Sequence, residues 1–291
     1  MVGRGGGDAP QGSNRCRIVG PAVDTGRVGR PHLHFLGHST VRVELAGHVV
    51  LTDPLLTGRV GPLRRVVPVP ASETYAGVDL VLLSHLHGDH LHLPSLRLLG
   101  PDVRVVAPRG AGAWLRARGL RHVTEVLPGE SLTHGALRVT AVPAEHAGHR
   151  WGPRLTHGPD TPAVGHLVEG GGRTVYAAGD TDLTDAMDLL GERGVDVALL
   201  PVWSWGLTLG PGHLDPAGAA EAVARLRPRV AVPVHWGTLA LRGVAHLPRM
   251  RRLLTDPPRD FAAAVAARGL DTAVVVAEPG QPVPLPVGTT S

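Results

Sequence analysis

The sequence contains a single cysteine and no lysine. Cys16 stands alone among 291 residues, so neither an internal disulfide nor a thiolate metal site can form within one chain. A reducing compartment fits this composition, and we expect a cytoplasmic protein. No uninterrupted apolar stretch has the length of a membrane-spanning helix. The first thirty residues contain no apolar core of a secretory signal, so we predict none there.

The absence of lysine also affects how the charge is interpreted. All 29 basic residues are arginine, and the formal net charge is +4. A basic protein suggests a nucleic-acid partner. However, the arginines are spread along the chain, and the bias toward Arg, Ala, Gly, Pro and Val is typical of a GC-rich coding genome. We therefore do not expect nucleic acid to be the partner.

Regular structure is predicted from about residue 32 onward. Residues 1–31 are rich in Gly and polar residues, which predicts a disordered or loosely attached tail before one domain at 32–291. Strands and helices recur in two halves, about 32–135 and 136–285, which favours two packed sheets with helices outside. Strands are predicted at 33–36, 40–45, 48–52, 79–83, 103–107, 124–127, 137–142, 163–168, 173–178, 195–200, 230–233 and 272–277. Helices are predicted at 94–99, 111–118, 184–191, 215–226, 247–254 and 259–268.

The most informative stretch is Ser84-His85-Leu86-His87-Gly88-Asp89-His90. It places three imidazoles and a carboxylate directly after an apolar run that is predicted to form a strand. A strand fixes the backbone, and the loop after it aims the side chains. Zn²⁺ favours imidazole nitrogen, with carboxylate oxygen as a second ligand type. The motif therefore predicts a metal site.

Three later strands end in the same way, with one metal-competent side chain just past the carboxyl end. If these ends meet at one edge of the sandwich, the candidate ligands are His85, His87, Asp89, His90, His146, Asp180 and His235. Seven ligands are too many for one tetrahedral zinc ion. They suit two metal ions that share a carboxylate and leave positions open for water.

This set of ligands resembles that of the metallo-β-lactamase superfamily of binuclear metallohydrolases. The resemblance spans about residues 33–240 and implies an α/β fold, an αββα sandwich of two mixed sheets flanked by helices. It implies that Asp53 supports the site from behind. The ligands it implies are His85, His87 and His146 for the first metal, Asp89, His90 and His235 for the second, and Asp180 between them.

Three segments point to one branch of the superfamily. Residues 37–41 with 51–54, residues 200–216 and residues 233–238 are similar to the branch that contains N-acylphosphatidylethanolamine-hydrolysing phospholipase D and the ascorbate-6-phosphate lactonases. The resemblance does not fix the substrate, and we expect a small-molecule or lipid-like substrate with an ester or phosphate group. A homo-oligomer is a further hypothesis.

Two more histidines and one loop are candidates for the active site. His38 either contacts the substrate or holds another site residue, or else it hydrogen-bonds a turn. His213 precedes a predicted helix start, where anionic groups are favoured, and would contact a substrate phosphate or carboxylate. Residues 57–70 are rich in Arg and Pro, and one hypothesis is a mobile loop over the site.

The predicted reaction is hydrolysis of an ester, lactone or phosphodiester by a hydroxide that bridges two metal ions. Asp89 would orient the nucleophile and then carry a proton to the leaving group. Zinc suits the ligands best, with manganese or iron as alternatives.

Two other functions on the same fold stay open. A tRNA-processing-type nuclease would need a basic arm or an RNA-binding insertion, and the sequence has neither. A di-iron redox protein usually has Glu where His87 stands, together with a flavin-binding domain.

Overall fold

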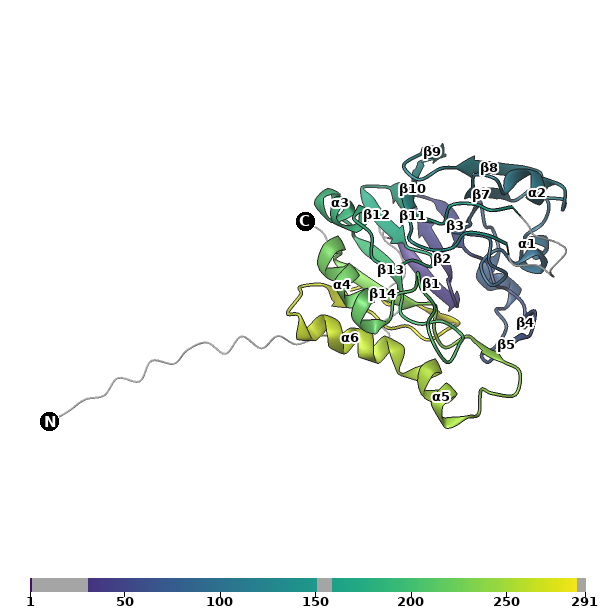
Figure 1. Ribbon diagram of the computed structural model, residues 1–291. Coiled ribbons are helices and arrows are strands. Elements are labelled where there is room, and N and C mark those ends of the chain that lie inside the picture. Colours follow the sequence, from purple (N-terminus) through teal and green to yellow (C-terminus); the bar gives the residue numbers. More distant parts are fainter. Residues whose placement is uncertain (2–30, 151–158, 287–291) are drawn as a thin grey trace.

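Two seven-stranded mixed β-sheets form the centre of the computed structural model, which describes Met1, residues 31–150 and residues 159–286. Helices cover the outside of both sheets (Figure 1). On one side lie α1 (Leu93–Leu99) and α2 (Gly112–Arg116), and on the other α3 (Ala186–Arg193), α4 (Pro216–Leu226) and α6 (Pro257–Ala267). The predicted αββα sandwich of mixed sheets is therefore confirmed. The predicted tail at residues 1–31 lies almost wholly outside the described residues.

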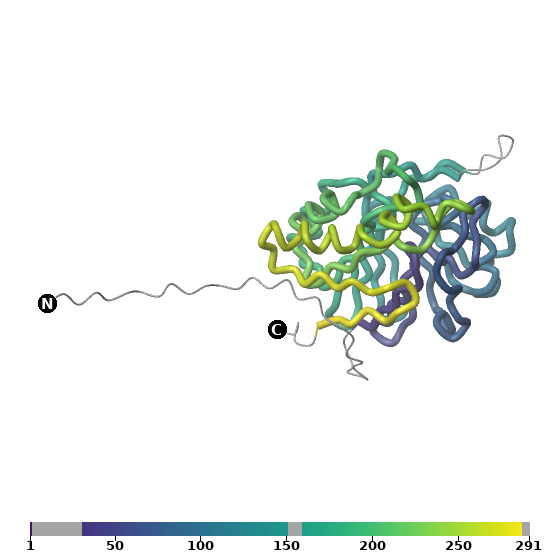
Figure 2. The backbone as a smooth tube through the Cα atoms, turned by 90° about the horizontal axis from the view of Figure 1, so that it is seen from below, coloured from purple at the N-terminus to yellow at the C-terminus, as the bar shows by residue number. Residues whose placement is uncertain are grey.

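The first sheet is built mainly from the first half of the chain. The strand order is β17 (Gln281–Pro282), β1 (His32–Gly37), β2 (Thr40–Leu45), β3 (His48–Thr52), β6 (Leu80–Leu82), β7 (Arg104–Pro108) and β8 (His122–Val126). Strands β3, β6, β7 and β8 are parallel, and β17 returns from the C-terminal end to pair with β1 (Figure 2). The helices that follow β6 and β7 are α1 (Leu93–Leu99) and α2 (Gly112–Arg116).

The second sheet is built from the second half. Its order is β16 (Ala273–Val274), β14 (Val230–Val234), β13 (Val197–Pro201), β12 (Arg173–Ala177), β11 (Val164–Gly170), β10 (Leu137–Pro143) and β9 (Ser131–His134). The helices of this half are α3 (Ala186–Arg193), α4 (Pro216–Leu226), α5 (Pro248–Thr255) and α6 (Pro257–Ala267). Among the described residues, no helix combines the length and the apolar composition needed to cross a membrane.

A third, three-stranded sheet was not predicted. It has the order β15 (Leu239–Leu241), β5 (Leu63–Arg65) and β4 (Arg59–Val60), and the 3₁₀ helix η1 (Ser72–Tyr75) follows. The hypothesis of a mobile loop at 57–70 is wrong in this respect, because hydrogen-bonded strands occupy part of that segment. Two- and three-residue strands carry too little alternation of apolar and polar residues to be detected in a sequence.

Apolar side chains from both sheets form one continuous core. Phe35 and Val43 of the first sheet and Val139 and Tyr176 of the second are each at most 1% exposed. A second cluster lies on the outer face of the first sheet, beneath α1 and α2. The strands are thus buried on both faces, which explains why they read as apolar runs rather than as alternating patterns.

The candidate ligands follow strands that run in one direction. Strands β3 and β6 are parallel, and β12 and β14 both run parallel to β13. β10 is antiparallel to β11, which is antiparallel to β12, so β10 points the same way as β12. By the same reasoning, β1 points the same way as β3. The carboxyl ends of these strands therefore share an edge of their sheets.

The two sheets come into close contact at this edge through Gly179, which follows β12. Gly179 has φ +65°, and a Cβ added there would lie 2.5 Å from the Cβ of Ser84, which follows β6. Any larger side chain would push the loop that carries Asp180 away from the loop that carries His85. Glycine at this position keeps the two loops together.

We expect Gly179→Ala to destabilise the protein by about 1–3 kcal/mol more than Gly172→Ala, because overpacking adds to the cost of the left-handed backbone. Gly172 is the matched control, since it has φ +72° and no atom within 4 Å of an added Cβ. Urea denaturation of both variants measures the difference. Equal losses of stability would show that the contact with Ser84 is not restrictive.

Candidate metal centre

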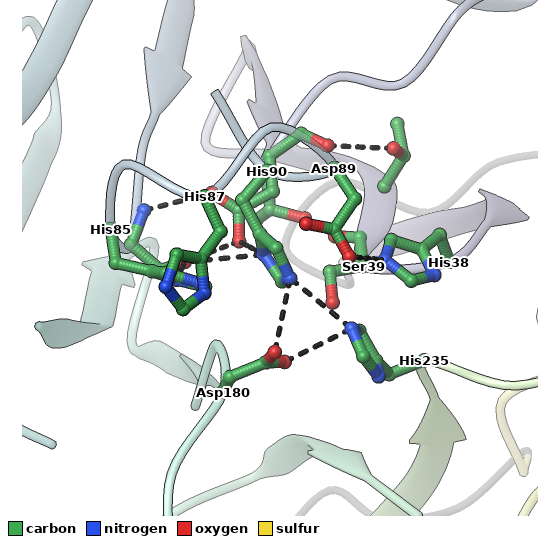
Figure 3. Close-up of polar contacts among 12 residues, drawn as sticks. His38, Ser39, His85, His87, Asp89, His90, Asp180 and His235 are labelled. Carbon is green, nitrogen blue, oxygen red and sulfur yellow. Dashed lines mark hydrogen bonds and ion pairs between the residues drawn. The ribbon is translucent and has the colours of Figure 1, made fainter. Parts of the chain in front are cut away.

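The loop after β6 carries four of the candidate ligands on one short turn. His85 and His90 are fully buried, whereas His87 and Asp89 are partly accessible at its outer side. Figure 3 shows their side chains directed toward the same space, with Asp180 and His235 approaching from below. The predicted ligands therefore come together although they are far apart in sequence.

Three imidazoles form the first cluster. His87 Nδ1 lies 3.0 Å from His85 Nε2 and 3.1 Å from His146 Nε2. The other nitrogen of His146, Nδ1, donates to the carbonyl of Gly212 at 2.8 Å, which leaves a lone pair on Nε2. The three ring nitrogens lie within 4.8 Å of one another, which is a spacing that suits ligands of one metal ion.

The second cluster joins Asp89, His90 and His235 with His38. The Nε2 atoms of His90 and His235 are 3.1 Å apart, and His38 Nε2 is 3.0 Å from Asp89 Oδ2. The His38 ring also lies against the His235 ring, with a centroid separation of 3.9 Å. His38 thus belongs to this cluster, as one of the two hypotheses for it required.

Asp180 lies between the two clusters. Its Oδ1 is 3.2 Å from His235 Nε2, and its Oδ2 is 3.2 Å from His90 Nε2 and 3.4 Å from His213 Nε2. It also forms potential metal-binding groups with residues of the first cluster, His85 and His146. A carboxylate in this position can offer one oxygen to each of two cations.

Asp53 supports the loop from behind, as predicted. Its carboxylate accepts hydrogen bonds from the Ser84 backbone N–H at 2.8 Å, from Ser84 Oγ at 2.6 Å and from His90 Nδ1 at 2.8 Å. Since the Ser84 hydroxyl donates to Asp53, it is free to accept from His85 Nδ1, 2.9 Å away. One buried carboxylate therefore orients both His85 and His90.

Burial sets the protonation state of several imidazoles. It lowers the pKa of His85 well below its usual value, that of His87 to about 4 and that of His235 to about 3. It also lowers the pKa of His146. Neutral imidazoles keep the lone pairs that a metal ion needs.

The pKa of His90 shifts in the opposite direction. Burial alone would lower it, but the nearby carboxylates of Asp180 and Asp53 raise it well above its usual value. Burial alone would raise the pKa of Asp89, but the hydrogen bond from His38 and the charge of nearby histidines hold it well below its usual value. The pocket therefore favours a positive charge between its carboxylates, which a bound cation would also provide.

The donors and acceptors of this pocket fit divalent metal ions. His235 Nδ1 donates to the Trp203 carbonyl at 2.7 Å, so its Nε2 carries a lone pair. That atom faces Asp180 Oδ1, a buried acceptor with no hydrogen-bond donor among the described residues. Two acceptors 3.2 Å apart cannot satisfy each other. A cation bound by both of them would.

The backbone of the site is strained. Within the described part of the chain, five residues other than glycine have positive φ, and three of them are His38, Asp53 and His235. Such conformations cost about 1–3 kcal/mol each and cluster at functional sites. Tertiary contacts hold them in place, such as the hydrogen bond from His235 N–H to the His38 carbonyl at 2.8 Å.

His213 also reaches the site. It is partly exposed, and its Nδ1 lies 3.2 Å from the carbonyl oxygens of Gly210 and Pro211 while its Nε2 faces Asp180. Burial alone would lower its pKa, but the hydrogen bond and charge of Asp180 raise it. It therefore lies beside the carboxylate that joins the two clusters.

Sequence reasoning missed several supporting contacts. Ser84 stands inside the motif, and only the structure shows that it connects Asp53 to His85. The carbonyls of Trp203 and Gly212, which fix the tautomers of His235 and His146, have no side-chain signal at all.

A family model described as a beta-lactamase superfamily domain matches residues 48–236 of the chain. The chain belongs to the metallo-β-lactamase superfamily. Its expected similarity to the phospholipase D and lactonase branch stays a prediction.

Two individual proteins are similar to the chain over most of its length. A UPF0173 metal-dependent hydrolase of Methanopyrus kandleri is 33% identical over 256 residues, which cover 85% of this chain and 96% of the relative. The structure of Igni18, a metallo hydrolase of Ignicoccus hospitalis, is similar with a TM-score of 0.67 at 26% identity, covering 87% of this chain and 97% of that one.

A third similarity concerns the fold alone. CmlA, a diiron beta-hydroxylase of Streptomyces venezuelae, has a TM-score of 0.60 at 20% identity, covering 89% of this chain and 55% of CmlA. The superfamily fold therefore occurs in proteins with different chemistry, so the reaction must be argued from the site.

We expect Asp53→Asn to weaken metal binding about ten- to hundredfold, because an amide cannot accept all three of the hydrogen bonds that this carboxylate receives. Titration of the protein with zinc by calorimetry measures the change. Asp79→Asn is the control, since Asp79 also accepts a backbone hydrogen bond, from Val49 N–H at 2.8 Å, but lies at the amino end of β6. Similar metal affinities in both variants would contradict the supporting role of Asp53.

Proposed function

We propose that this protein is a binuclear metal-dependent hydrolase that cleaves an ester, lactone or phosphodiester bond in a small-molecule or lipid-like substrate. The coarser part of this statement, a metal-dependent hydrolase, rests on the superfamily and on relatives that carry that name. The binuclear centre and the substrate class are the further steps, and the geometry of the site supports them.

The observation that carries the proposal is the position of Asp180 between two clusters of ligands. His85, His87 and His146 are the proposed ligands of the first ion. Asp89, His90 and His235 are those of the second, and the two oxygens of Asp180 are directed to different neighbours. An isolated metal site would not require a buried carboxylate in this position.

Two bound divalent ions, most simply zinc, would lower the pKa of a water molecule toward neutrality and polarise the substrate oxygen. The chain prepares for this in several ways. Asp53 and the carbonyls of Trp203 and Gly212 fix the ligand tautomers, so the lone pairs are aimed before substrate arrives. Little reorganisation is then needed during the reaction.

Asp89 has a second role in the proposed mechanism. The hydrogen bond from His38 holds one of its oxygens in place, and the side chain is 12% exposed. It can orient the attacking water and later transfer a proton to the leaving group. His38 is thus a positioning residue that acts through Asp89.

Substrate would approach from the outer side of the centre. His87, His146 and His213 are partly accessible there, whereas His85 and His90 are enclosed by the protein. His213 lies beside Asp180 and has a ring nitrogen in reach of that side. We assign it to contact a negatively charged substrate oxygen.

Two divalent ions per chain are expected in the purified protein. Metal analysis by plasma mass spectrometry measures the stoichiometry, and Asp180→Ala should reduce it because both ions lose a ligand. A single ion in wild type that Asp180→Ala leaves in place would contradict the binuclear centre. Iron with a visible absorption band would favour the di-iron redox alternative instead.

We expect His87→Ala and Asp180→Ala to abolish turnover of ester, lactone or phosphodiester substrates. The reduction should exceed the factor of about one hundred that is typical when a residue supporting a metal ligand is replaced. Far-ultraviolet circular dichroism should show that the fold is retained. His122→Ala is the control, because His122 is exposed on β8, away from the centre. Near-normal turnover by both site variants with unchanged metal content would refute the assignment.

A further inference from the structure

A basic pocket borders the loop of residues 84–90, which carries four of the candidate ligands and is called the metal loop below. Its volume is about 800 Å³, which is in the range of small-molecule sites, and Arg59, Arg64 and His92 are part of its lining. None of its lining residues is acidic. No acidic residue lies between Asp53 and Glu73 in the sequence, so arginines are the only charged residues of that segment.

The two arginines are direct partners across a hairpin. In the antiparallel pair β4–β5, Arg59 is paired with Arg64, and Val60 with Leu63. Directly paired residues lie on the same face of a sheet, and like charges in this position are destabilising. Arg64 Nη1 is moreover buried without a hydrogen-bond partner among the described residues. The hairpin thus places two cations together, and neither forms an ion pair with a carboxylate among the described residues.

Arg65 shows what a purely structural arginine looks like in the same strand. Its guanidinium donates to the carbonyls of Leu36, Leu55 and Pro68. Successive side chains of a strand point to opposite faces, so Arg65 is turned toward the protein while Arg64 is on the other face. The two neighbouring arginines, Arg64 and Arg65, therefore differ in role.

A frame of paired strands and packed apolar side chains holds the pair beside the candidate metal centre. Leu63 packs with Leu55 and Leu239 in a small apolar cluster of its own. β5 pairs with β15, which begins four residues after His235, and Arg64 is opposite Ala240.

The frame also contacts the metal loop. A Cβ added to Gly88 in that loop would lie 3.4 Å from Val60 Cγ1. His92, two residues after His90, lines the same pocket as Arg59. The pocket is thus fixed relative to the candidate ligands on both sides.

We propose that Arg59 and Arg64 form a subsite for an oxyanion, a phosphate or carboxylate group that the substrate carries apart from the bond that is cut. Guanidinium groups bind such planar or tetrahedral oxyanions with paired, charge-assisted hydrogen bonds. Binding would also relieve the repulsion within the pair. The assignment rests on the proposed hydrolase function and adds that the preferred substrate is anionic.

A small molecule fits this pocket better than a nucleic acid does. Sequence-independent binding of RNA or DNA uses many cations along an extended track. Here only two arginines face each other across one hairpin, in a single pocket. Recognition of a single oxyanion is what this arrangement supports.

The test compares two esters that differ in one charge: the mono-4-nitrophenyl ester of adipic acid and 4-nitrophenyl hexanoate. We expect metal-loaded wild type to prefer the anionic ester in kcat/KM. Arg59→Gln and Arg64→Gln should each reduce kcat/KM for the anionic ester about ten- to hundredfold and leave the hexanoate unchanged, because each removes a charged hydrogen-bond donor.

Arg104→Gln is the matched control. It removes the same charge from an exposed arginine at the amino end of β7, at the opposite edge of the sheet. Metal content is measured for all variants. Equal kcat/KM for the two esters in wild type, or a preference that both pocket variants retain, would overturn the subsite.

Calorimetric titration with inorganic phosphate separates this inference from the proposed function. Phosphate affinity that falls in Arg59→Gln and Arg64→Gln but not in Arg104→Gln supports the subsite even if no ester is hydrolysed. In that case only the proposed reaction fails. Equal affinity in all four proteins places phosphate elsewhere and overturns the subsite. Salt-dependent RNA binding that requires both arginines would overturn it in favour of a nucleic-acid surface.

Discussion

The arrangement of the candidate metal centre depends on the buried carboxylate of Asp53. Its two oxygens accept from the backbone and hydroxyl of Ser84 and from His90. Through Ser84 it also fixes His85. Since His85 belongs to one ligand cluster and His90 to the other, a single anion sets the relative position of both. Two hydrogen bonds fix the backbone of Asp53 itself. Its N–H donates to the Leu82 carbonyl at 2.9 Å, and Thr40 Oγ1 donates to the Asp53 carbonyl at 2.7 Å.

This degree of order has a free-energy cost. Buried imidazoles and carboxylates lose hydration, and strained backbone at His38, Asp53 and His235 adds to the cost. Burial of the apolar core of the two sheets stabilises the fold and offsets this cost. Metal binding would return part of the cost, because a cation would satisfy acceptors such as Asp180 Oδ1 that the protein leaves facing each other. Folding stability and metal affinity would therefore be linked.

Much of this could be predicted from the sequence, for a specific reason. Long apolar strands are easily recognised in the sequence, and the sheet determines where a residue directly after a strand lies. His85, His146, Asp180 and His235 were located in this way. The partner of His38 could not be found, because Asp89 is 51 positions away and the contact depends on a strained turn. Backbone carbonyls that fix histidine tautomers are equally invisible, since every residue has one.

The short strands β4, β5 and β15 were missed for the opposite reason. Each has only two or three residues, so no alternation of apolar and polar residues can be detected. Their arginines also make the segment look like a loop in the sequence. Yet these strands bring Arg59 and Arg64 together beside the metal loop, by pairing that links residues after β3 with residues after β14. The sequence signals that identify the proposed metal ligands therefore differ from the contacts that form the proposed oxyanion subsite. The proposed ligands follow long strands, whereas the pocket is built around short strands whose partners only the folded structure reveals. A fold shared with enzymes of other chemistry leaves specificity to such connections.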